Sequence, residues 1–296
     1  MRKFLTLLAA LILMLSFVAC SSSEIQKVEG TDKREVTESN NGAKNNEFAF
    51  SETTLVDNEN CTIKVTSIDP DSMWGYTLNF YFENKTVKNL MFSINSSSIN
   101  GLMNDPFFAS EVAAGKKVNK GVSWDISALE DAGMNVTDIT FDFLVYDSND
   151  FMADNLVEGE FSIFPYGESA VQKYSYEEGP NDLVIFDNEY AAMIATDFDE
   201  NGLFGYTMTV YLENKTDKDV MFGLDNCSVN GFMVDPFWSK ELNSGKKAVS
   251  DIIWSESSFE ENGINIVDEI EFSISVYDSN DFMADNLVEG TYTITH

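Results

Sequence analysis

Oxygen-bearing side chains gather in a fifteen-residue segment, VYDSNDFMADNLVEG, which the chain contains twice, at residues 145–159 and 276–290. Part of this segment follows the EF-hand calcium loop, with Asp147, Asn149 and Glu158 at positions 1, 3 and 12. Phe151 and Met152 stand where that loop needs an oxygen ligand and a glycine, so the segment is not an EF-hand. A hairpin loop can still gather carboxylates around a hard cation. The candidate Ca²⁺ ligands are therefore Asp147, Asn149, Asp150 and Asp154 in the first copy and Asp278, Asn280, Asp281 and Asp285 in the second.

A simpler interpretation exists for this segment and for a second acidic loop. Residues 197–202 match the first six EF-hand positions, but Met208 stands at position 12 and the loop lies between expected strands. In either loop the Asp and Asn side chains can instead cap backbone amides of a solvated turn. A calcium-dependent rise in melting temperature would distinguish the two interpretations.

Catalytic chemistry has little support in the sequence. The only histidine is His296, and there is no cysteine pair or His-x-x-x-His motif, which excludes histidine-based hydrolytic triads and zinc sites. Two carboxylates can hydrolyse a glycosidic bond, but among 50 acidic residues a pair at any given separation is certain to occur. We therefore expect no enzyme and no cofactor other than Ca²⁺, with a carboxylate-dependent glycan hydrolase kept as an alternative.

Aromatic side chains are the other candidates for binding. Most of them alternate along expected strands, which is typical of a sandwich core. Two pairs differ, because each follows Asp-Pro outside a clean strand, where an exposed aromatic side chain indicates an interface. The candidate binding residues are Phe107, Phe108, Phe237 and Trp238.

The duplicated segment belongs to a longer internal repeat. The motifs Glu-Asn-Lys-Thr, Asn-Gly, Asp-Pro-Phe and Gly-Lys-Lys each recur at an offset of 130, which becomes 131 after one inserted residue near Glu269. Each copy is predicted to be one domain. The copies are residues 47–165 and 183–296, and the segment at 166–182, which contains glycine and proline, is the predicted linker.

Each copy is expected to be an antiparallel β-sandwich. β-Branched and aromatic runs such as residues 61–69, 75–84 and 139–146 alternate with turn signals, giving seven or eight short strands in each copy. Asn-Gly predicts a type I′ hairpin turn. One short helix in each copy is predicted from the capping boxes at Ser127 to Glu130 and Ser257 to Glu260, with glycine stops at Gly133 and Gly263. The predicted fold class is all-β, with two tandem immunoglobulin-like sandwiches.

The N-terminal region predicts secretion and lipid anchoring. Residues 1–19 form a predicted signal peptide, because the apolar run from Phe4 to Val18 follows two basic residues and is too short to span a membrane. The sequence Phe-Val-Ala-Cys at its end resembles a bacterial lipobox, which makes Cys20 the lipidation site. Acyl chains on Cys20 would hold the protein on the extracellular face of the cell membrane. Residues 20–46 are polar and are predicted to be a flexible tether.

Charge and cysteine content exclude other classes. A net charge of −32 argues against nucleic acid as a partner, since phosphate contacts need lysine and arginine. Besides Cys20 the chain has only Cys61 and Cys227, one in each copy and at non-equivalent positions, so an intradomain disulfide is excluded. We expect two free thiols, although a bond between the copies stays open.

Together these motifs resemble a repeat domain of uncharacterised lipoproteins from Gram-positive bacteria. The resemblance rests on five features: Glu-Asn-Lys-Thr, Met-Phe at 91–92 and 221–222, the Asn-Gly turn, Gly-Lys-Lys and the closing Val-Tyr-Asp strand. It implies immunoglobulin-like domains outside the cell and no catalytic residue. The expected function is non-catalytic binding of an extracellular protein or glycan. A calcium-stabilised adhesive or structural protein is the alternative from a different class.

Overall fold

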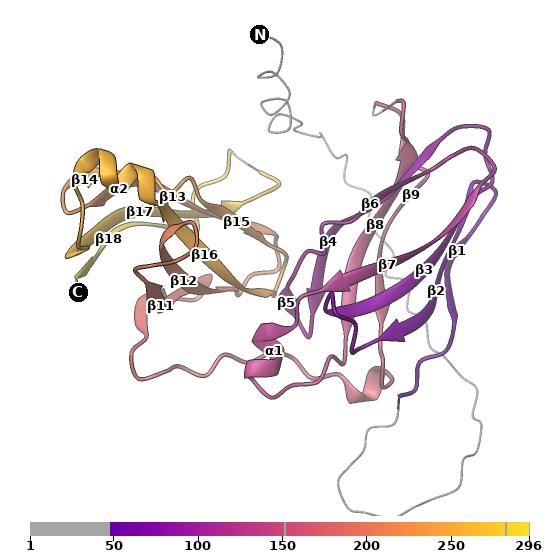
Figure 1. Ribbon diagram of the computed structural model, residues 1–296, viewed down its shortest axis with the longest axis horizontal. Coiled ribbons are helices and arrows are strands. Elements are labelled where there is room, and N and C mark those ends of the chain that lie inside the picture. Colours follow the sequence, from indigo (N-terminus) through magenta and orange to yellow (C-terminus); the bar gives the residue numbers. More distant parts are fainter. Residues whose placement is uncertain (1–47, 151, 282, 296) are drawn as a thin grey trace, which may run out of the picture.

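The computed structural model describes residues 48–150, 152–281 and 283–295 (Figure 1). The predicted signal peptide, Cys20 and the tether at residues 20–46 lie outside these described residues. The described chain is almost entirely β-structure, which confirms the expected all-β class. In this part of the chain no helix has the length and apolar character needed to cross a membrane.

Residues 48–165, called the first half here, form two facing antiparallel sheets. Its strands are β1 (Thr53–Asp57), β2 (Cys61–Asp69), β3 (Tyr76–Asn84), β4 (Leu90–Ile99), β5 (Leu102–Met103), β6 (Ala109–Val112), β7 (Lys117–Trp124), β8 (Ile139–Asp147) and β9 (Val157–Ile163). One sheet has the order β1-β2-β3-β7, and the other places β4 between β8 and the short strands β5 and β6, with β9 beside β8. This is an immunoglobulin-like β-sandwich.

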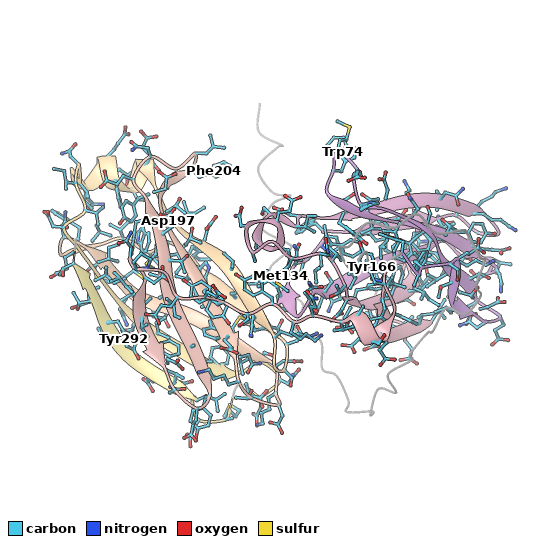
Figure 2. The ribbon with its side chains drawn as sticks, turned by 90° about the horizontal axis from the view of Figure 1, so that it is seen from below. Trp74, Met134, Tyr166, Asp197, Phe204 and Tyr292 are labelled. Carbon is cyan, nitrogen blue, oxygen red and sulfur yellow. The ribbon has the colours of Figure 1, made fainter. Side chains whose placement is uncertain are left out.

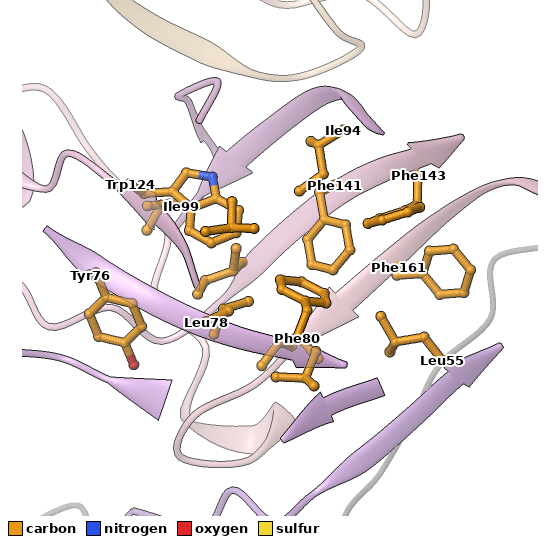
Figure 3. Packing of buried hydrophobic residues seen from close by; sticks show 14 of the residues in the cluster. Leu55, Tyr76, Leu78, Phe80, Ile94, Ile99, Trp124, Phe141, Phe143 and Phe161 are labelled. Atoms are coloured by element: carbon orange, nitrogen blue, oxygen red, sulfur yellow. The ribbon is translucent and has the colours of Figure 1, made fainter. Parts of the chain in front are cut away.

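Aromatic side chains from both sheets fill the space between them (Figure 3). Along β3 the burial alternates with the period of two that a strand imposes, so that Leu78, Phe80 and Phe82 point inward. The Phe80 ring meets that of Phe141 from the opposite sheet at 5.9 Å between centroids, edge to face. Edge-to-face contact is a favoured geometry for aromatic rings. The expected aromatic core is therefore present, with Trp124 fully buried in it.

The second half, residues 183–295, repeats the same order of elements. Its strands are β10 (Leu183–Asp187), β11 (Ala191–Asp199), β12 (Gly205–Asn214), β13 (Val220–Val229), β14 (Phe232–Met233), β15 (Ser239–Leu242), β16 (Lys247–Ser255), β17 (Glu269–Asp278) and β18 (Val288–Thr295). Its two sheets correspond strand for strand to those of the first half. Trp254 occupies the place of Trp124 and is also fully buried, in a separate hydrophobic cluster.

The hairpin turns agree with the sequence, whereas the strand count exceeds the prediction. Each half has nine strands in the described chain, because a two-residue strand follows each Asn-Gly turn. Asn100 and Gly101 have φ of 50° and 81°, and Asn230 and Gly231 have 51° and 80°. Positive φ at both central residues confirms the predicted type I′ geometry.

The predicted capping boxes are wrong, although the helices exist. Helix α1 (Ser127–Asp131) begins after Ile126 without a side-chain cap. Helix α2 (Glu256–Asn262) is capped by Ser255, whose side chain accepts from the Ser258 amide, so the cap lies two residues before the one expected. The C-terminal prediction holds, since Gly133 and Gly263 have φ of 64° and 67°.

A short parallel contact joins one sheet of each half into a single nine-stranded sheet. Strand β16 runs beside β5, with Lys247 opposite Leu102 and the Lys247 amide donating to the Gly101 carbonyl at 3.1 Å. Lys246 Nζ donates to Ser98 Oγ at 3.0 Å. We call this contact the junction. Figure 1 shows β5 at the side of the first half that faces the second.

The predicted linker is an ordered segment packed against both halves. It contains the 3₁₀ helix η1 (Glu168–Ala170). The Tyr174 amide donates to the Asn100 carbonyl at 2.7 Å, and the Tyr174 carbonyl accepts from Lys247 Nζ at 3.0 Å. The Tyr176 ring stacks on that of Tyr211 with centroids 4.4 Å apart and planes at 15°. These contacts fix the position of one half against the other.

Candidate functional site

Four large apolar side chains project from equivalent hairpins of the two halves. Met73 and Trp74, in the turn between β2 and β3, are 86% and 75% exposed. Leu203 and Phe204, in the turn between β11 and β12, are 90% and 72% exposed. We call these turns the hairpin tips. Figure 2 shows Trp74 and Phe204 along the same side of the molecule. Exposed apolar side chains that gather at one place indicate a binding surface.

A glycine behind each tip fixes the path of the backbone. Gly75 and Gly205 have φ of 103° and 131°, and their amides close the turns onto Ser72 and Gly202 at 3.0 Å. A Cβ atom on Gly75 would lie 2.3 Å from the Trp124 carbonyl oxygen. A Cβ atom on Gly205 would lie 2.1 Å from the Trp254 carbonyl oxygen. Only glycine accepts this conformation and this close approach. The tips are therefore held against the end of a core strand.

The buried tryptophan beside each glycine is itself fixed by a hydrogen bond. Trp124 Nε1 donates to Ser97 Oγ at 2.9 Å, and Trp254 Nε1 donates to the Val234 carbonyl at 3.1 Å. Ser97 lies in β4 of the opposite sheet, and Val234 directly follows β14 of the opposite sheet. The position of each tip is thereby tied to both layers of its sandwich.

An acidic groove of about 600 Å³ lies beside the tip of the second half. Glu200 lines it from the turn, and Glu256, Phe259 and Glu260 line it from α2. The centroid of the Phe259 ring lies 6.0 Å from that of Tyr206. Burial is the larger cause, and the nearby Glu200 carboxylate the smaller one, that together raise the pKa of Tyr206 to about 12. None of the residues lining this groove is basic. The groove therefore suits a partner that carries positive charge next to an apolar group.

The first half has the tip without the same acidic groove. Pro70, Ile126 and Leu129 stand at the positions of Glu200, Glu256 and Phe259. Glu130 corresponds to Glu260 and Asp71 replaces Asn201, so two acids stand where the second half has three. The two tips thus share apolar character while their surroundings differ in charge.

Each predicted aromatic pair is divided between surface and core. Phe107 and Phe237 are 99% and 88% exposed, with φ of 53° and 55°, a conformation that costs free energy for a non-glycine residue. Phe108 instead packs against the first core, 5.8 Å from Phe82. Trp238 packs against the second core, and its Nε1 donates to Ser250 Oγ at 3.0 Å. Only the first member of each pair is exposed.

The predicted calcium ligands are not brought together. Lys88 Nζ lies 2.8 Å from Asp147, and Lys218 Nζ lies 2.8 Å from Asp278. Each lysine hydrogen bond holds the pKa of its carboxyl below the ordinary value. Among the described residues no three His, Cys, Asp or Glu side chains are placed to hold a metal ion. The expected Ca²⁺ loops are, in the described residues, turns stabilised by lysine.

The remaining predicted ligands cap backbone amides or point to solvent. Asp147 and Asp278 also accept from the amides of Asn149 and Asn280, whose side chains are exposed. Asp150 and Asp281 accept from the amides two residues further on, whereas Asp154 and Asp285 are exposed. In the second acidic loop, Asp199 caps the amide of Asn201. Each of the three loops thus contains an aspartate that caps a backbone amide, and calcium binding stays a prediction.

The hairpin tips were not among the residues singled out from the sequence, although a signal was present. Met73-Trp74 and Leu203-Phe204 recur at the offset of 130 within segments otherwise composed of turn residues. The apolar character is the same in both copies while the residue types differ. A core position would give the same pattern, and only the structure places these side chains outside the core.

Comparison with known proteins finds no matching family model and no matching curated protein. The solved structures that are similar to this chain include the following three. The YadV chaperone is 11% identical, with 79% of this chain and 100% of that chain covered and a TM-score of 0.25. The CsuC–CsuE chaperone–tip adhesion subunit complex of Acinetobacter baumannii is 12% identical, with coverage of 74% and 91% and a TM-score of 0.21. Red sea bream transglutaminase is 10% identical, with coverage of 77% and 30% and a TM-score of 0.20.

Proposed function

We propose that this protein is a non-catalytic lipoprotein of the cell envelope, whose two sandwiches bind an extracellular protein through the hairpin tips. One observation carries the proposal: both halves expose two large apolar side chains at the same turn, on a backbone that a glycine fixes. Because the backbone of each tip is fixed, a partner that covers the pair has only the side chains left to order. Such side chains are typical anchors of protein interfaces.

The acidic groove defines the chemistry of the partner. Glu200, Glu256 and Glu260 surround the tip of the second half, so a lysine or arginine beside an apolar side chain would fit there. The excess of acids over the whole chain would also accelerate association with a basic protein. Binding at the second tip is therefore expected to weaken as the salt concentration rises, and binding at the first tip is expected to change less.

Photo-crosslinking tests the role of the tips directly. A benzophenone amino acid replaces Trp74 or Phe204 in the full-length lipoprotein on its native membrane. The matched control is Val87, which is 94% exposed at the opposite end of β3. We expect both tips, and not position 87, to capture the same protein. Capture of equal amounts of the same proteins from all three positions would contradict the proposal.

Localisation is tested by the cysteine that carries the predicted anchor. The apolar run ending at Ala19-Cys20 supports export followed by acylation, and two or more acyl chains give stable membrane attachment. Cys20→Ser is expected to move the protein from the membrane fraction to the medium and to abolish incorporation of a labelled fatty acid. An unchanged membrane fraction with the serine variant would argue against the lipid anchor.

A further inference from the structure

At the junction the second half covers strand β5 of the first half. The equivalent strand of the second half, β14, lies at its far side and is not covered in the described chain. In β5, Leu102 and Met103 are 5% and 8% exposed, and Met103 belongs to the hydrophobic cluster of the second half. The equivalent residues of β14, Phe232 and Met233, are 48% and 69% exposed. Strand β14 pairs only with β13 in the described sheet, whereas β5 pairs with both β4 and β16. Figure 1 shows β14 at the outer side of the second half.

The strand that fits this surface is also repeated. Strand β7 corresponds to β16 and forms the edge of its sheet, with β3 as its neighbour in the described part. Lys117 pairs with Glu83 at 3.0 Å just as Lys247 pairs with Glu213 at 3.6 Å, so the edge residue is held in the same way in both halves. Lys247 is the residue that meets β5. Lys117 is therefore placed to meet an equivalent strand.

We propose that a second copy of this chain docks the β7 edge of its first half on the β14 hairpin, repeating between molecules the junction that β16 and β5 make within one. The equivalent pairing places Lys117 of the second copy opposite Phe232, with its amide directed to the Gly231 carbonyl. Because the two contacting surfaces are different, each copy keeps one of them available. The contact therefore adds copies head to tail.

The charges at the two surfaces are complementary. Within the molecule, Lys246 bonds Ser98 and shares a small cavity with Thr140 and Asp142. At the equivalent positions the β14 side has Ser228, Glu271 and Ser273, so a carboxylate stands in place of Thr140 and a serine in place of Asp142. The β7 side has Lys116 in place of Lys246 and Lys120 in place of Ser250. The basic β7 edge thus meets one carboxylate, Glu271, on the β14 side.

The pairing register provides a covalent test with residues 21–296, which is the predicted mature chain without Cys20. Lys117→Cys and Phe232→Cys are placed in one chain, because the equivalent residues Lys247 and Leu102 are direct partners. Cys61 and Cys227 are buried and do not compete. Mild oxidation is expected to give a ladder of disulfide-linked oligomers. The control pair is Lys117→Cys with Leu203→Cys, which is exposed outside the proposed contact. Ladders of equal yield from both pairs would overturn the proposal.

Charge reversal tests the same contact without a covalent bond. Lys116→Glu and Glu271→Lys each place like charges together, and each is expected to weaken self-association by about tenfold or more in sedimentation equilibrium. Mixing the two variants restores an opposite pair at every contact, so association is expected to return. Circular dichroism verifies that both exposed variants are folded. A mixture that associates no better than either variant alone would refute the head-to-tail arrangement.

Discussion

Asn84 offers a quantitative test of how the turn between β3 and β4 is held. This asparagine is the second residue of the Glu-Asn-Lys-Thr motif and is 1% exposed. Its Nδ2 donates to the carbonyls of Lys88 at 2.7 Å and Val112 at 2.8 Å, and its Oδ1 accepts from the Thr86 amide at 2.9 Å. The side chain therefore ties one turn to a strand of the opposite sheet.

Replacing Asn84 with alanine removes all three bonds to the backbone. At about 1 kcal/mol for each bond, the free energy of unfolding is expected to fall by about 3 kcal/mol. The bond that Oδ1 accepts from the Thr86 hydroxyl adds little, because that hydroxyl can turn to water. Asn214→Ala in the second half should have a similar effect, since its Nδ2 reaches Lys218 and Leu242 in the same way.

Urea denaturation of the mature chain, followed by far-ultraviolet circular dichroism, measures the change. The matched control is Asn119→Ala on β7, an exposed asparagine of the same half, for which a change within about 0.5 kcal/mol is expected. If Asn84→Ala costs no more than Asn119→Ala, the buried bonds do not stabilise the turn and the reasoning fails.

Three further predictions concern protonation, thiol reactivity and the tips. Burial, followed by the Glu160 carboxylate, raises the pKa of Asp142 to about 6. The folded state therefore holds this proton more tightly than the unfolded state, and the contribution of Asp142 to stability falls as the pH rises from about 4 to about 6. The urea midpoint of Asp142→Asn should lack this decline. Identical pH profiles of the variant and the unchanged protein would contradict the prediction. Burial raises the pKa of Cys61 to about 11 and that of Cys227 to about 12, so iodoacetamide should label neither thiol in the folded protein and both in urea, as mass spectrometry can verify. Gly205→Ala would place a Cβ atom 2.1 Å from a carbonyl of β16, and a loss of about 2 kcal/mol is expected by the same urea assay, whereas an unchanged midpoint would show that the turn is not strained.

The sequence was sufficient for those features that depend on local physics. Asn100-Gly101 specifies its turn because these two residues accept positive φ more readily than other types. Alternating aromatic residues in β3 specify which face is buried, since successive side chains of a strand point to opposite sides. The start of α2 was misplaced because three serines, Ser255, Ser257 and Ser258, are candidates for the cap, and the structure uses Ser255.

Contacts between distant segments could not be predicted in this way. The sequence offers Asp147 as a calcium ligand, and Lys88 becomes its partner only when β4 and β8 are paired. The tips look like core residues until the turn is folded, because Trp74 and Phe204 have the composition of a strand interior. The junction combines a backbone bond from Lys247 with a side-chain bond from Lys246, and no composition or spacing indicates that these two lysines meet the first half.

The ordered linker has a consequence for how a multivalent partner would be held. Tyr174 and Tyr176 join the two halves, so packing sets the separation between Trp74 and Phe204. An unstructured linker would let this separation vary. When one tip is occupied, the other is already positioned, and the second contact forms at a high effective concentration. The two tips would therefore bind together only to partners whose two docking points have the same spacing, and only such partners would gain avidity.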